Sequence, residues 1–81
     1  MTKDEIREIV FQVLSSIAPE ADFSSLREDE ELREILDLDS MDFLNFLTGL
    51  HEATGINIPE ADYSKLATLG DAIDYLAKAD A

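Results

Sequence analysis

The chain has 81 residues, 46% of them hydrophobic, which is enough for one small folded domain with a modest core. Its 6 basic and 19 acidic residues give a net charge of −13. This balance excludes nucleic acid and anionic membrane surfaces as partners, because both attract clustered Lys and Arg, and it favours proteins with basic patches. The absence of cysteine excludes a disulfide scaffold and a thiol supplied by the chain itself.

The first predicted element is a helix over residues 3–16. Thr2 and Glu5 form a Thr-x-x-Glu capping box, and Pro19 disfavours helical geometry at the residue before it. Between them apolar residues recur at helical spacing: Ile6, Ile9, Val10, Val13, Leu14 and Ile17. No secretory signal precedes this helix, and no segment approaches the roughly 20 apolar residues of a membrane span, so we expect a cytoplasmic protein.

A long connection follows over residues 18–39. A structureless loop of this length is unusual in a compact domain, so we expect it to pack across the bundle, with one helical turn at Asp29–Glu34. Its apolar anchors are Phe23, Leu26, Leu32, Ile35, Leu36 and Leu38.

The second main helix is predicted over residues 40–54, with Asp39 and Ser40 as preferred N-cap residues and Gly55 as its C-terminal cap. One broad side should face the core, and it carries Phe43, Leu44, Phe46, Leu47 and Leu50. Met41 falls on the opposite side and should be exposed. Gly49, also on the polar side, suggests a close approach to the backbone, although chance explains it equally well.

The remaining residues predict an extended segment at 56–58, a short third helix at Pro59–Ser64 with Pro59 at its first position, and a last helix at Leu69–Ala79 capped by Thr68. Nothing resembles a sheet. We therefore expect one all-α domain over residues 1–81, a small four-helix bundle of three main helices plus a short third one, with a long loop between the first two main helices.

Several kinds of catalytic or metal site are excluded. His51, the only histidine, lies eleven residues along the same helix from Ser40, about 16 Å away and far beyond the roughly 3 Å needed for proton transfer. Asp37 and Asp39 begin like a calcium-binding loop, but Thr48 stands where the bidentate Glu belongs, which leaves only weak divalent binding open. No zinc-protease motif or Gly-rich phosphate loop is present, so we expect no catalysis by the chain alone.

Two segments carry a resemblance to a known family. Leu38-Asp39-Ser40-Met41-Asp42 resembles the Asp-Ser-Leu signature of acyl carrier proteins, and the stretch from Ile58 to Leu76 resembles that family's third-helix and fourth-helix region. The resemblance covers the whole chain in length, acidity, helix order and long first loop, and it identifies the chain as a suspected specialised member.

The resemblance implies that Ser40 is the attachment point of a 4′-phosphopantetheine arm, which a separate phosphopantetheinyl transferase takes from coenzyme A. The arm ends in a thiol that carries acyl groups as thioesters, so the missing sulfur would be imported. Condensing or acyl-transferring enzymes with basic patches are the implied partners, and the chain is expected to be a monomer. The residues implied to meet these partners are Asp39, Met41, Asp42, Asn45 and Glu52.

In such proteins the acyl chain can fold back between the second and third helices. The residues that could line that space are Leu44, Phe46, Leu47, Ile58, Ala61 and Leu66; plain core packing explains each equally well.

Several positions depart from the family pattern. Asp37 stands where many members have Gly, and Asn45 and His51 stand where fatty-acid-synthesis carriers commonly have Glu. The partner enzymes that the resemblance implies belong to fatty-acid, lipid or polyketide-type biosynthesis.

Two alternatives stay open: a peptidyl or aminoacyl carrier loaded by a ligase, and an unmodified acidic adaptor in which Ser40 is only a helix cap.

Overall fold

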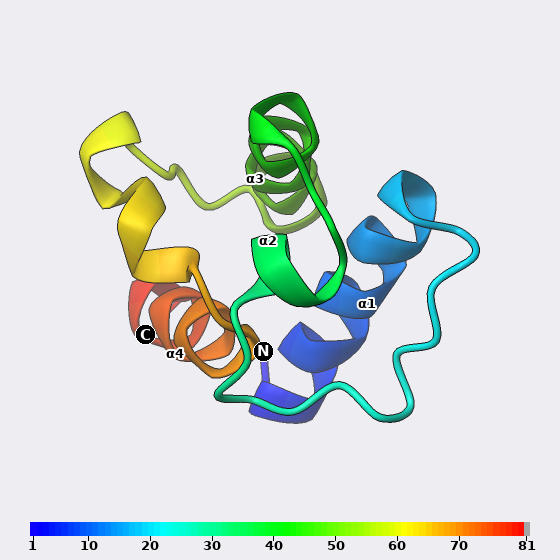
Figure 1. Cartoon of the computed structure of the whole chain (residues 1–81). Coiled ribbons are helices and arrows are strands. Elements are labelled where there is room, and N and C mark those ends of the chain that lie inside the picture. Colours follow the sequence, from blue (N-terminus) through cyan, green and yellow to red (C-terminus); the bar gives the residue numbers. More distant parts are fainter. Residues whose placement is uncertain (81) are drawn as a thin grey trace.

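Three long helices and two short ones make up the computed structural model, which describes residues 1–80 (Figure 1). They are α1 (Lys3–Ile17), α2 (Leu32–Ile35), α3 (Ser40–Thr54), the 3₁₀ helix η1 (Glu60–Leu66) and α4 (Leu69–Asp80). No strand occurs among these residues, which confirms the predicted all-α bundle with a long first loop. Within the same part of the chain, no helix is both long and apolar enough to cross a membrane. The expected cytoplasmic location and the single-domain boundary stay predictions.

The ends of α1 and α3 follow from local sequence. At α1 the predicted capping box forms: the Glu5 backbone N–H donates to Thr2 Oγ1 at 3.1 Å and the Thr2 N–H to Glu5 Oε1 at 2.8 Å. The hydrogen bonds from Thr2 lower the pKa of Glu5. At the end of α3, Gly55 takes the predicted left-handed conformation, with φ of 73°. Both α1 and α3 therefore begin and end within one residue of their predicted limits.

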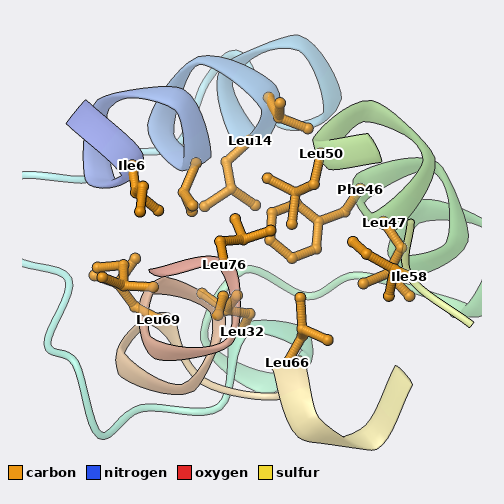
Figure 2. Close-up of a cluster of buried hydrophobic side chains, with 14 of the residues drawn as sticks. Ile6, Leu14, Leu32, Phe46, Leu47, Leu50, Ile58, Leu66, Leu69 and Leu76 are labelled. Carbon is orange, nitrogen blue, oxygen red and sulfur yellow. The ribbon is translucent and has the colours of Figure 1, made fainter. Parts of the chain in front are cut away.

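One hydrophobic core joins all five helices (Figure 2). Its fully buried side chains come from every helix: Ile6, Val10, Leu14, Leu32, Phe46, Leu50, Leu66, Leu69, Ala72 and Leu76. The α1 helix packs against both α3 and α4, and η1 packs against α4. Residues far apart in sequence thus hold the two ends of the chain and the middle helix together.

Gly49 lies where α1 crosses α3. A Cβ atom at this position would come 2.6 Å from Val13 Cγ1 on α1, closer than real Cβ contacts allow. The close approach to the backbone that the sequence suggested is therefore made by the protein's own helix. The absence of a side chain lets the two helices pack tightly.

We expect Gly49→Ala to destabilise the fold by about 1–3 kcal/mol, the usual cost of overpacking. Alanine gains up to about 1 kcal/mol in helix propensity, but Val13 is β-branched and held in one rotamer, so it cannot easily move away. Urea unfolding followed by circular dichroism measures the change. The double variant Gly49→Ala/Val13→Ala should lose less stability than the sum of the losses in the two single variants. If the losses simply add, the proposed clash between a side chain at position 49 and Val13 is wrong.

The helical turn in the long connection lies later than predicted. The connection runs back along α1 before it reaches α2 at residues 32–35, whereas the sequence placed a turn at Asp29–Glu34 (Figure 1). Long-range contacts fix this position: the Leu32 N–H donates to the Ala67 carbonyl at 2.8 Å, and Glu31 pairs with Thr68. Among the predicted anchors, Leu32 and Leu38 are buried, but Ile35 is 49% exposed, which corrects its assignment to the core.

The third predicted helix is a 3₁₀ helix and begins one residue after Pro59, which occupies its N-cap position rather than its first turn. The Tyr75 hydroxyl of α4 donates to Asp62 Oδ2 of η1 at 2.7 Å. This bond, followed by the one from Lys65, lowers the pKa of Asp62, and it raises the pKa of Tyr75. The bond therefore stabilises the fold at neutral pH, and its contribution is lost as the pH falls through the lowered pKa of Asp62.

Candidate functional site

Ser40 is exposed at the first residue of α3, and its neighbour Asp39 is the residue that caps the helix. Asp39 Oδ1 accepts a hydrogen bond from the Asp42 N–H at 2.8 Å, and Asp42 Oδ2 accepts one from the Asp39 N–H at 3.4 Å. This reciprocal capping box occupies both flanking carboxylates. Of the two predicted cap residues, Asp39 takes the role, and the Ser40 hydroxyl is left available.

Arg33 of α2 lies beside that hydroxyl. Its Nη2 donates to Ser40 Oγ at 3.4 Å, and its guanidinium carbon lies 5.8 Å from the centroid of the Phe43 ring. Arg33 could not be recognised from the sequence as a neighbour of Ser40, because the two residues belong to different helices and no local motif links them.

Two hollows border the exposed side of α3. The larger, about 420 Å³, opens beside the hydroxyl and is lined by Arg33, Ser40, Phe43, Leu44, Tyr63 and Ser64. The smaller, about 130 Å³, lies between α3 and the segment leading into η1, and is lined by Leu47, Thr48, His51, Asn57, Ile58 and Tyr63. Tyr63 contributes to both, which sequence reasoning also missed. A hollow of about 530 Å³ elsewhere, between Lys65 and Lys78, includes none of these residues.

The predicted acyl-pocket residues separate into three groups. Leu44 borders the larger hollow, and Leu47 and Ile58, which lie next to each other in Figure 2, border the smaller one. Phe46 and Leu66 are completely buried in the core. Ala61 is exposed and lines neither hollow.

The residues predicted to meet partners lie mostly on the surface. Met41 is 66% exposed, as expected, and Asp39, Asn45 and Glu52 are exposed as well. Asp42 is half-buried. Leu44, which the helical wheel placed on the core side, is 42% exposed and borders the larger hollow. The exposed apolar surface beside Ser40 is therefore larger than the sequence indicated.

His51 is exposed near the other end of α3, where its Nδ1 lies 2.8 Å from the Ile56 carbonyl oxygen. Within residues 1–80, no group of three or more His, Cys, Asp or Glu side chains is arranged to hold a metal ion.

The sequence of this chain is similar to those of a known family. The family described as "Phosphopantetheine attachment site" matches residues 4–76. Curated relatives named acyl carrier protein include one from Wolinella succinogenes, 33% identical over 90% of both chains. Another from Lactobacillus johnsonii is 32% identical over 94% of both. A third from Acidothermus cellulolyticus is 28% identical over 98% of this chain and 93% of its own.

The chain belongs to the acyl carrier protein family.

Members of this family are carriers and not catalysts, and they bind 4′-phosphopantetheine covalently. The residues around Ser40 fit such a group. The Ser40 hydroxyl is exposed and does not cap the helix, because Asp39 does. The Arg33 guanidinium lies within hydrogen-bonding distance of it, and the larger, mostly apolar hollow opens beside it. When bound, the group supplies a thiol that can form thioesters. The chain itself has no cysteine and therefore no thiol of its own.

The backbone conformation of Asp37 bears on one of the departures from the family pattern. It has a φ of 53°, in the left-handed region that glycine adopts without cost and other residues rarely enter. The position at which the resemblance leads us to expect Gly is thus one where the backbone takes a left-handed conformation just before α3. Aspartate is among the residues that tolerate this conformation best, so the turn persists here.

We expect Asp37→Gly to stabilise the protein by about 0.5–1 kcal/mol, because the relieved backbone strain exceeds the entropy that glycine loses on folding. Thermal unfolding measures the gain. Asp37→Ala is the matched control: it removes the same charge but keeps a Cβ, so it should not share the gain. Equal stabilisation of both variants would assign the effect to charge rather than to φ.

Proposed function

We propose that Ser40 is the attachment point of 4′-phosphopantetheine and that the chain carries acyl groups as thioesters to partner enzymes of fatty-acid, lipid or polyketide-type biosynthesis. The observation that carries this proposal is the exposed Ser40 hydroxyl at the first residue of α3, with the helix already capped by Asp39. A serine needed as a cap would lose that role on modification. Here a phosphopantetheinyl transferase can modify the hydroxyl without removing a hydrogen bond that holds the helix.

Partner enzymes would meet the exposed side of α3. Met41 offers an apolar contact directly beside the attachment point, and Asp39, Asp42 and Glu52 offer negative charge, with Asn45 between them. A net charge of −13 steers such a carrier towards basic surfaces during diffusional encounter. We therefore propose that charge brings partners to this side and that Met41 contributes the apolar contact.

The test is the intact mass of the protein after incubation with coenzyme A and a broad-specificity phosphopantetheinyl transferase. We expect a mass gain of one phosphopantetheine, located by peptide mapping on the segment that contains Ser40. No gain, or a gain on another residue, would overturn the proposal.

Met41→Ala should slow modification or use by partner enzymes and leave the fold intact, because most of the side chain is exposed and little packing is lost. Initial rates with the transferase, together with melting temperatures, measure both effects. Ile35→Ala is the matched control, since Ile35 is an apolar residue of similar exposure on α2. A large fall in the melting temperature of Met41→Ala, or an equal loss of rate in both variants, would contradict the assignment.

We further propose that this carrier is specialised rather than the general fatty-acid one. Asn45 and His51, which stand where fatty-acid-synthesis carriers commonly have Glu, are both exposed, so the partner-facing side of α3 carries less negative charge than such carriers commonly have. The rate at which a fatty-acid ketosynthase uses the loaded protein tests this. Equality with a general fatty-acid carrier would defeat the idea.

A further inference from the structure

Arg33 is one of two basic side chains within residues 1–80 that form no salt bridge. Lys3, Arg7, Arg27 and Lys65 each form a salt bridge with a carboxylate. Within residues 1–80, Arg33 and Lys78 form none, although the chain has 19 acidic residues, and of these two only Arg33 lies beside Ser40. Its guanidinium instead donates to the Ser40 hydroxyl at 3.4 Å, a long hydrogen bond between neutral oxygen and cation.

The surrounding structure holds Arg33 in this place. Its neighbour Leu32 is completely buried, and the Arg33 carbonyl accepts a hydrogen bond from the Leu38 N–H at 2.9 Å, which ties α2 to the turn before α3. The side chain lies over the Phe43 ring of α3, with the guanidinium carbon 5.8 Å from its centroid, within cation–π range. Backbone and ring together direct the guanidinium towards Ser40.

Resting on the proposed attachment at Ser40, we propose that Arg33 is a positioning residue that binds the phosphate of the attached group. The phosphoryl oxygens of a phosphodiester on Ser40 lie only two covalent bonds from Oγ, so a guanidinium that already reaches Oγ can reach them. Arg presents paired donors that match phosphate geometry, and charge-assisted bonds of this kind are stronger than the existing bond to a neutral hydroxyl.

The negative charges around Ser40 explain why a contact between Arg33 and the phosphate would be favourable. A phosphodiester adds one negative charge beside Asp39 and Asp42, and like charges at close range repel. The N-terminus of α3 favours an anion, but Asp39 already occupies its capping position. Arg33 supplies the positive charge that offsets the carboxylates, and it would hold the first bonds of the arm along the hollow lined by Phe43 and Tyr63.

The test compares the unloaded and loaded forms of the wild type and three variants by thermal unfolding. Arg33→Ala removes the proposed contact, Arg33→Lys keeps the charge but not the paired donors, and Arg27→Ala removes an equal charge from an exposed arginine that pairs with Asp29. We expect loading to change the melting temperature of wild type and Arg27→Ala equally. In Arg33→Ala the change on loading should be less favourable by about 2–8 °C, with Arg33→Lys between them.

A second readout follows the single phosphorus atom of the loaded protein by ³¹P NMR relaxation. It should report a restrained phosphate in wild type and Arg27→Ala, and a more mobile one in Arg33→Ala. Equal responses of the two alanine variants in both measurements would overturn the role of Arg33 while leaving the attachment at Ser40 intact. Failure of the transferase to modify Ser40 at all would overturn the proposed function and this inference together.

Discussion

Replacing Ser40 with alanine is expected to abolish loading completely and to change the free energy of unfolding by no more than about 0.5 kcal/mol. The hydroxyl is the proposed attachment atom, so no other group can take its place. The fold should tolerate the change because the side chain is exposed and Asp39 caps the helix. Intact mass after treatment with coenzyme A and a transferase, together with thermal unfolding, measures the two effects.

Ser64→Ala is the matched control. Ser64 is also exposed and lines the same hollow as Ser40, but it lies on η1 rather than at the start of α3. We expect Ser64→Ala to load like wild type. Residual loading of Ser40→Ala, or loss of loading in Ser64→Ala, would show that the assignment of the attachment point is wrong.

Replacing Leu47 with alanine should cost about 2–5 kcal/mol of stability, as expected for a core leucine. The Leu47 side chain is 2% exposed and belongs to the hydrophobic core, where it lies next to Ile58 (Figure 2). A small domain has only about 5 kcal/mol to lose at the low end of the usual range, so this variant should be partly or largely unfolded. Urea unfolding followed by circular dichroism gives the value.

Leu44→Ala serves as the control on the same helix. Leu44 lies one turn earlier but is 42% exposed, so the same truncation should cost no more than about 1 kcal/mol. Similar losses in both variants would mean that the helix faces the core in a different orientation.

The local structure was predictable because it depends on neighbours in sequence. The capping box at Thr2 needs only a residue three positions later, and Gly55 needs only its own freedom to take a positive φ. For the same reason α3 begins and ends where the sequence indicated. The Asp-Ser-Met triplet likewise indicated Ser40 as the proposed attachment point, since that motif is local.

What sequence could not supply depends on contacts between distant segments. A helical wheel gives the direction of Leu44, but its exposure depends on whether another helix covers that end of α3. The position of α2 follows from the hydrogen bond between Leu32 and Ala67, thirty-five residues apart in the chain. Arg33 and Tyr63 reach the site from separate helices, so no spacing rule could have joined them to Ser40.

Met1 and Asp80 form an ion pair that joins the start of the chain to the end of α4. The amino group of Met1 lies 2.6 Å from Asp80 Oδ2, and the hydrogen bond from the amine to this carboxylate, together with its negative charge, raises the pKa of the amine. A purification tag fused before Met1 would turn the amine into a neutral amide and break the pair. The stability of a tagged protein would then be measured without the ion pair between Met1 and Asp80, so untagged protein is the proper reference for the variants described above.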